Sequence, residues 1–441
     1  MRLMARLTRR GGEAMDTQPR RVRPVVVRGL RRVVSAALAG GKRMPEPVEG
    51  MLFAAGRRMP PRVRRFVRYA SRYSRYSDPA VFPARPPVPE TPVRLFVGPA
   101  NFAGQGWAWA RAAERHVAGV GATVFSFGDG YAFTVDYDVP MQMYALSRKW
   151  QKDQRLHVTS HYTHVLIEAE RPVLGTRYGS TCDGDIRVLR RAGLAVALIS
   201  HGSDLRIPSR HAQMVADSPF RDSSWETVPI LERTTTHNAK LLNSFDGHTY
   251  VSTLDLLDYA PRAVWCPGVV DVDAWMTETV ALERRVPVVV HAPSNGRFKG
   301  SRLIDPIMED LDRRGIVWYR RIERVDPRDM PAVYTGADIV IDQFTMGLYG
   351  VAACEAMAAG RVVVSYVGDT VRSRVRDLTG GDLPIIEATP ETLVEVIEKI
   401  LDDRGAARDV AMAGPSYVRE HHDGRRSAAA LAPFLTGGIG G

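Results

Sequence analysis

The sequence predicts an α/β protein in which two doubly wound domains face each other across a cleft, preceded by a basic N-terminal arm. From Val93 onward, short apolar runs alternate with longer periodic segments, which is typical of a parallel sheet with crossover helices. The alternation begins again at Val286, and 441 residues are too many for one ordinary core. Two successive α/β units therefore predict two domains, with ligands in the crevice at the carboxyl ends of their strands.

The first domain is expected over residues 93–270. It opens with the strand "VRLFVG", continues with the helix "QGWAWARAAERHVAG", which a glycine closes, and then enters the strand "ATVFSF". Helical stretches separate several of the later apolar runs, as parallel strands require. Four of these runs are predicted strands: "THVLIEA", "LAVALIS", "HTYVST" and "AVWCPG".

The second domain is expected over residues 286–405, after the connector "PGVVDVDAWMTETVALERR". Helices and strands alternate in it as in the first domain. Its predicted elements are, in order, "VPVVVHAPS" (strand and loop), "SRLIDPIMEDLDRRG" (helix), "IVWYRR" (strand), "DPRDMPAVYTG" (helix), "ADIVIDQ" (strand), "FTMGLYG" (loop), "VAACEAMAA" (helix), "RVVVSYV" (strand), "LPIIEA" (strand) and "TPETLVEVIEKILDD" (helix). Residues 406–441 are expected to form a C-terminal helix and a flexible tail.

The positive charge of the chain is concentrated in the arm, residues 1–90. The arm has 21 Arg or Lys against 6 Asp or Glu, a balance of +15, whereas the rest has 39 against 43, or −4. A mildly acidic body lacks the basic face that nucleic acid requires, so we expect no nucleic-acid partner. In the arm, arginines alternate with apolar residues, which is consistent with amphipathic helices on an anionic membrane surface or with a solvated basic tail.

Two further features of composition bear on the location of the protein. Its three cysteines, Cys182, Cys266 and Cys354, form no close pair and have no zinc-binding spacing, which suits a reducing compartment and predicts no metal site. No stretch has the length and apolarity of a membrane span or a secretory signal. We expect a cytoplasmic protein, peripheral to the inner face of the membrane if the arm binds there. The prolines of "FPARPPVPETP" predict an extended linker rather than packed structure.

The segment "FTMGLYGVAACEAMAAGRVVV", residues 344–364, places one carboxylate, Glu355, among small and apolar residues. A buried strand precedes it, and its glycine-bearing loop delivers a helix N-terminus to the edge of the sheet, where free N–H groups favour a phosphate or a sugar oxygen. Gly347 and Gly350 allow a ligand to approach the backbone. A buried carboxylate needs hydrogen-bond donors, which the hydroxyls of a ribose would supply; the alternative is an ion pair with Arg361 or contact with water.

A second candidate segment, "HAPSNGRFKGS", follows the first strand of the second domain. Arg297 and Lys299 lie two residues apart in this glycine-rich turn, where they are able to reach the two phosphates of a nucleotide diphosphate. The alternative is a pair of solvated loop cations. Strand, basic turn and helix-borne glutamate in one domain together favour a nucleotide-sugar site.

The order of "HAPSNGRFKG" and "DQFTMGLYGVAACEAMAAGRVVV" resembles the donor domain of retaining glycosyltransferases of the GT-B fold, of the group 1 or family 4-like type. This resemblance implies that Arg297 and Lys299 contact the diphosphate and that Glu355 binds the donor ribose. Members of the family often carry another glutamate eight positions earlier, where this chain has Gly347. The backbone N–H groups of Gly347, Leu348, Tyr349 and Gly350 are then candidates for holding the sugar.

The resemblance extends to two loops of the first domain. Gly104, Gln105 and Gly106 resemble the loop that faces the donor phosphates and the acceptor, although an ordinary strand-to-helix turn is an equal alternative. In "LISHGSDLRIPSRH", the resemblance places His201 near the reacting sugar. Asp204 is a candidate for holding the His201 ring in one tautomer, and a structural histidine is the alternative.

The predicted function is transfer of a sugar, of the hexosyl type, from a nucleotide-diphosphate donor such as a UDP- or GDP-sugar to an envelope, lipid-linked or other glycan acceptor. The resemblance implies retention of configuration. No cofactor beyond the donor is expected. Two alternatives stay open: a sugar-nucleotide epimerase of the same fold, and a catalytically silent module that binds nucleotide sugars.

Overall fold

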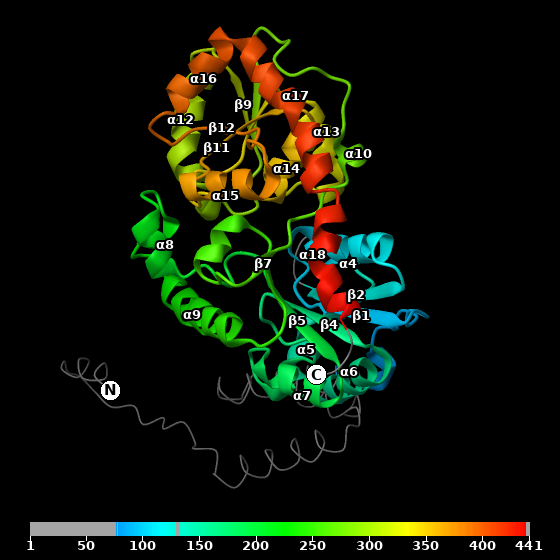
Figure 1. Ribbon diagram of the computed structural model, residues 1–441. Coiled ribbons are helices and arrows are strands. Elements are labelled where there is room, and N and C mark those ends of the chain that lie inside the picture. Colours follow the sequence, from blue (N-terminus) through cyan, green and yellow to red (C-terminus); the bar gives the residue numbers. More distant parts are fainter. Residues whose placement is uncertain (1–75, 77, 129–132, 438–441) are drawn as a thin grey trace, which may run out of the picture. The chain divides into compact units, whose positions relative to one another are not determined.

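The computed structural model describes residues 76, 78–128 and 133–437. Within it, Val81–Gly441 forms one compact unit that contains two parallel β-sheets (Figure 1). We call the part of the chain around the first sheet the first half and the part around the second sheet the second half. In the described part of the chain, no helix is long and apolar enough to cross a membrane.

The first half is built on a seven-stranded sheet in the order β3-β2-β1-β4-β5-β6-β7, in which every neighbouring pair is parallel. Its strands are β1 (Val93–Gly98), β2 (Val120–Gly128), β3 (Tyr137–Pro140), β4 (His164–Glu168), β5 (Ala195–Ser200), β6 (Thr249–Val251) and β7 (Val264–Trp265). Each residue of β4 is buried, because the strand lies inside the sheet with helices over it. The short strand β3 is absent from the strands that the sequence predicted.

Helices connect these strands. They are α4 (Gln105–His116), α5 (Met141–Leu146), α6 (Arg148–His161), α7 (Asp183–Arg191), α8 (Pro208–Met214) and α9 (Val228–Ser244). The helix α4 begins at the residue that the sequence predicted, and it packs its apolar face on β1 and β2. Trp109 on this face is fully buried, and its indole N–H donates to the Pro267 carbonyl at 2.8 Å. The glycine-rich loop before α4 is thereby held at the carboxyl end of β1.

The second half is built on a five-stranded parallel sheet in the order β12-β11-β10-β8-β9. Its strands are β8 (Val288–His291), β9 (Trp318–Arg321), β10 (Ile339–Ile341), β11 (Val362–Ser365) and β12 (Ile386–Glu387). Its helices are α10 (Val272–Trp275), α11 (Gly296–Lys299), α12 (Ser301–Arg313), α13 (Met330–Thr335), α14 (Val351–Ala358), α15 (Asp369–Thr379) and α16 (Leu393–Asp402). The sequence predicted this alternation, but it missed that the basic turn after β8 is itself one turn of helix, α11.

The C-terminal segment differs from the single helix and flexible tail that the sequence predicted. It forms two helices, α17 (Arg404–His421) and α18 (Arg425–Thr436). The first packs against α14 in the second half, and the second returns to the first half, where it lies beside α4 (Figure 1). Leu431 and Phe434 of α18 are buried in the same core cluster as Trp109. Apolar contact with α4 therefore gives this segment its structure.

The proline-rich linker is also more closely packed than predicted. Residues 82–91 form neither helix nor strand, as expected, but Arg85 donates to Gln154 and Asp153 of α6, both at 2.7 Å. Pro89 lies where a Cβ atom on Gly121 would approach within 2.5 Å, so the absence of that side chain allows the linker to settle on β2. The prediction of an unpacked linker is wrong. The remainder of the arm, residues 1–75 and 77, lies outside the described residues, and so does its predicted contact with a membrane.

Candidate functional site

Two adjoining cavities lie at the carboxyl ends of the two sheets and take residues from both halves. Cavity A, of about 300 Å³, is lined by His201 and Ser252 of the first half and by the loop before α14 in the second. Cavity B, of about 430 Å³, is lined mainly by the second half and contains Glu355. Both cavities share the lining residues Phe102, Ala103, Ser294, Lys299 and Val351. One elongated ligand is therefore able to occupy both.

The N-terminus of α14 stands at the junction of the two cavities. Val351, the first residue of the helix, lines both of them, while Ala352 and Glu355 face cavity B. The backbone N–H groups of the first turn have no partners within the helix, and the helix dipole adds partial positive charge there. The opposite wall of cavity B is apolar and partly aromatic. It includes Trp275, Ile322, Val325, Met330 and Tyr334.

Glu355 enters cavity B without a protein partner. No hydrogen bond or ion pair joins its carboxylate to another described residue, and Arg361 is instead bound to the Ala337 and Thr279 carbonyls. The alternative of an ion pair between Glu355 and Arg361 is therefore wrong. Burial raises the pKa of the Glu355 carboxyl to about 8, although Lys299 opposes this rise, and Asp342 adds to it. A buried carboxyl group without a protein partner is stabilised by a ligand that donates hydrogen bonds to it.

Lys299 was predicted from the sequence to contact a phosphate group of the ligand. It lines both cavities, and its ammonium group is bound to Asp342 Oδ1 at the end of β10. Asp342 is buried, and its Oδ2 atom has no hydrogen-bond partner among the described residues. A cation fixed at the junction of two cavities is able to attract an anionic group there.

Arg297 does not share this position. It lines neither cavity; its guanidinium donates to Asp222 Oδ2 at 2.5 Å and lies 4.9 Å from the centre of the Trp225 ring. The cause is α11, because residues two apart on a helix point in nearly opposite directions. The prediction that Arg297 and Lys299 converge on one ligand is thus not met in this structure.

The glycine-bearing loop before α14 is shaped by Gln343. The Gln343 side chain donates to the Leu348 and Tyr366 carbonyls and accepts from the Met346 N–H at 2.7 Å. Leu348, Tyr349 and Gly350 line cavity A, as the sequence placed them. Gly347 does not line it: the residue has a left-handed φ of 67°, and a Cβ there would lie 3.3 Å from the Tyr366 ring.

In the loop of Gly104, Gln105 and Gly106, too, only some of the predicted residues line a cavity. Gln105 lines cavity A, but its side chain is occupied by the backbone of Val269, with a hydrogen bond of 2.6 Å from the Val269 N–H. Gly104 and Gly106 line neither cavity. A Cβ on Gly106 would lie 2.8 Å from both oxygens of Glu168, so this glycine makes room for a carboxylate. The glycines thus shape the loop rather than the cavity wall.

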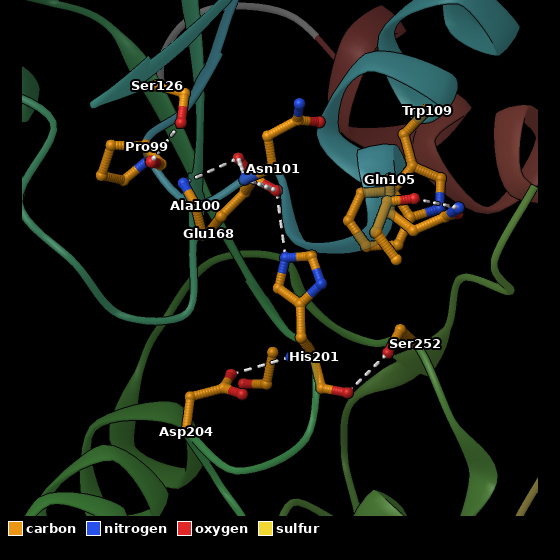
Figure 2. A network of polar contacts seen from close by, with 12 residues as sticks. Pro99, Ala100, Asn101, Gln105, Trp109, Ser126, Glu168, His201, Asp204 and Ser252 are labelled. Atoms are coloured by element: carbon orange, nitrogen blue, oxygen red, sulfur yellow. Dashed lines mark hydrogen bonds and ion pairs between the residues drawn. The ribbon is translucent and has the colours of Figure 1, made fainter. Parts of the chain in front are cut away.

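His201 lines cavity A, and its ring is held by Glu168 rather than by Asp204 (Figure 2). The ring atom Nε2 lies 3.0 Å from Glu168 Oε1, whereas Asp204 accepts from the backbone N–H groups of His201, at 2.8 Å, and Gly202, at 2.6 Å. The prediction that Asp204 orients the ring is therefore wrong. Asp204 instead fixes the turn that carries His201, because a carboxylate two or three residues along captures the free N–H groups of the turn.

Glu168 is the residue that the sequence analysis missed. It is the last residue of β4 and is fully buried. Its position at the carboxyl end of a central strand was the available signal, since such ends meet at the ligand crevice of a doubly wound sheet. The strand "THVLIEA" was predicted, but its single acidic residue was not examined as part of a site.

The chain was compared with known families and structures. No family model matches, and no curated protein matches. Among solved structures, sucrose-phosphate synthase from Thermosynechococcus elongatus has a TM-score of 0.53 and 14% identity, over 78% of this chain and 98% of that one. Anabaena HepE in complex with UDP and glucose has a TM-score of 0.52 and 14% identity, with the same coverage. A glycosyltransferase from Rickettsia africae has a TM-score of 0.50 and 11% identity, over 78% and 98% of the two chains.

These similarities show the fold. The chain has two parallel-sheet α/β domains arranged as in GT-B glycosyltransferases, which confirms the fold class predicted from the sequence. At this level of identity, they do not extend to individual residues.

Proposed function

We propose that the protein is a glycosyltransferase that takes a sugar from a nucleotide-diphosphate donor and transfers it to a hydroxyl-bearing acceptor. The observation that carries the proposal is the unpartnered Glu355 carboxylate in cavity B, which adjoins cavity A at the α14 N-terminus and Lys299. In this proposal, the nucleoside occupies cavity B, and its ribose hydroxyls donate to Glu355. The sugar and the acceptor meet in cavity A.

The junction between the cavities has the chemistry that a diphosphate requires. Lys299 supplies a fixed positive charge, and the first turn of α14 supplies unpaired N–H groups. When the bond between the sugar and the phosphate breaks, negative charge grows on the diphosphate, so groups already in place there would lower the barrier. The similarity in fold to HepE, which was solved with UDP and glucose, supports a UDP-sugar as the first donor to test.

The finer features follow the resemblance noted in the sequence. It implies transfer with retention of configuration, a hexosyl donor, and an acceptor that is a glycan or a lipid-linked sugar of the envelope. A GDP-sugar is a second donor to test. The donor is the only small molecule that the proposed reaction consumes besides the acceptor.

A calorimetric titration of the full chain with UDP-, GDP- and ADP-glucose tests the proposal. We expect one donor to bind, and Glu355→Gln to weaken its affinity by about tenfold, because one of the two carboxyl oxygens is replaced by an amide nitrogen that does not accept hydrogen bonds. Glu309→Gln, an exposed glutamate on α12, is the matched control and should bind as the parent does. The proposal fails if no donor binds or if Glu355→Gln binds as tightly as the parent.

A binding module without turnover is the second candidate, and one observation favours it. The carboxylate that the family often places at position 347 is absent, and the nearest polar side chains, Asp342 and Gln343, are engaged by Lys299 and by the loop backbone. Incubation of donor with acceptor extracts, followed by mass spectrometry, separates the candidates. A transferred sugar supports the enzyme, an isomerised donor without acceptor indicates the epimerase, and an unchanged donor indicates the module.

A further inference from the structure

The Glu168 carboxylate is surrounded by hydrogen-bond donors. Besides His201, it accepts hydrogen bonds from the backbone N–H groups of Ala100, at 3.2 Å, and Asn101, at 3.0 and 3.1 Å (Figure 2). Gly106, in the first turn of α4, leaves the carboxylate in contact with that turn. Both oxygens of Glu168 are therefore engaged as hydrogen-bond acceptors.

This fixes the proton on the His201 ring. Because Glu168 only accepts, the contact of 3.0 Å requires that Nε2 of His201 carries a hydrogen and donates it. In the tautomer with its hydrogen on Nε2, Nδ1 carries a lone pair. The rings of Phe102 and Trp109 pack against the imidazole, with centres 5.2 and 5.1 Å from that of His201.

The Nδ1 atom is turned away from Glu168 and has no hydrogen-bond partner among the described residues (Figure 2). The His201 side chain is 9% exposed, and the residue lines cavity A. A hydrogen-bond acceptor beside cavity A complements a group that carries a hydrogen, and a sugar hydroxyl is such a group.

We propose that Glu168 is a positioning residue that holds His201 with its Nδ1 lone pair facing cavity A, where Nδ1 accepts a hydrogen bond from a ligand hydroxyl. This inference deepens the proposed function and rests on it for the identity of the ligand. The hydroxyl belongs either to the donor sugar or to the acceptor, and the experiment below separates these two sources.

Nitrogen NMR of the full chain, labelled with ¹⁵N-histidine and free of ligand, tests the first part. We expect the His201 resonances, assigned by their loss in His201→Gln, to report hydrogen on Nε2 and none on Nδ1 at neutral pH. Glu168→Gln replaces an acceptor by an amide that is able to donate, so the hydrogen should move to Nδ1. Glu309→Gln should leave the His201 signals unchanged. A hydrogen on Nδ1 in the parent, or an unchanged tautomer in Glu168→Gln, overturns the inference.

Titration with UDP and with UDP-glucose, or with the donor found above, tests the second part. If the hydroxyl belongs to the donor sugar, Glu168→Gln should bind UDP normally and lose about tenfold in affinity for UDP-glucose. If it belongs to the acceptor, both nucleotides should bind normally, while kcat/KM for the acceptor falls by a similar factor. Parent-like behaviour of Glu168→Gln in every assay contradicts the inference. If the parent binds no nucleotide, the proposed function is contradicted instead. The NMR result on the His201 tautomer then still tests the first part of the inference.

Discussion

At the scale of single residues, Glu355 in cavity B and Glu168 behind His201 differ in their hydrogen-bond partners. Glu168 is surrounded by donors, so its hydrogen bonds contribute to holding the loops of the first half together. Glu355 has no donor, and burial raises its pKa to about 8. The buried Glu355 carboxyl group therefore lowers the free energy of unfolding, and a bound ligand is able to offset this loss.

This cost predicts a pH dependence of stability. The pKa of Glu355 is about 8 in the folded protein and about 4.3 in an unfolded chain, so the folded state binds more protons between these values. The contribution of Glu355 to stability is therefore lost as the pH rises through this window, by up to about 1.4 kcal/mol per pH unit. Glu355→Gln has no such loss. Its stability relative to the parent, measured by urea unfolding at pH 5, 6.5 and 8, should increase with pH; a constant difference would contradict the assignment.

At the scale of elements, the helical geometry of α11 places one of its two cations beside the cavities and the other away from them. Lys299 faces both cavities, and Arg297 faces the loop of the first half that contains Asp222 and Trp225. The sequence predicted a turn that contains both residues, and from a turn both side chains would reach one ligand. A single turn of helix, too short to be read from a periodic pattern, separated them.

Substitution of Arg297 and substitution of Lys299 should therefore have different effects on nucleotide affinity. Arg297→Ala is expected to stay within about twofold of the parent in affinity for UDP, because an exposed ion pair outside the cavities contributes little to binding. The pair Lys299→Met with Asp342→Asn should lower the affinity about tenfold or more, because it removes the cation without leaving Asp342 charged and unpaired. Equal effects of the two changes, measured by calorimetry, would show that Arg297 moves to the ligand on binding.

The contact of α17 with α14 supports the second half of the site. A Cβ on Gly414 would lie 2.6 Å from the Met357 carbonyl oxygen, so Gly414→Ala must push the two helices apart. We expect a loss of about 1–3 kcal/mol in the free energy of unfolding and weaker nucleotide binding, since α14 carries Glu355. Gly405→Ala on the same helix, whose new Cβ would lie 3.4 Å from Asp403 Oδ1, is the control. It should change stability by less than about 1 kcal/mol.

At the scale of the whole molecule, the alternation of strands and helices was readable from the sequence because each element carries its own local pattern. Glu355 and Lys299 were chosen as candidates for the same reason, since each belongs to a recognisable segment. Glu168 and α18 were not, because their roles depend on contacts with residues far along the chain, such as Ala100 and Trp109. Asp204 was assigned to the wrong partner because proximity in the sequence does not say whether a carboxylate meets a ring or a backbone N–H.

The packing of the linker sharpens the test of the predicted membrane contact. Because Arg85 and Pro89 belong to the folded body, a truncation that removes residues 1–75 is preferable to one that removes the whole arm. If the arm binds membranes, the full chain should sediment with vesicles containing anionic lipid, and the truncated chain should remain in the supernatant. Neutral vesicles provide the control. Equal sedimentation of both proteins with anionic vesicles would exclude this role for residues 1–75.

The return of α18 to the first half has a consequence for biosynthesis. The core around Trp109 includes Leu431 and Phe434, which are translated after the whole of the second half. The first half therefore completes its core only after the second half has been translated, and a nascent chain ending before residue 425 presents an uncovered apolar face. Early release of an incomplete polypeptide should thus yield a species that chaperones retain or proteases degrade.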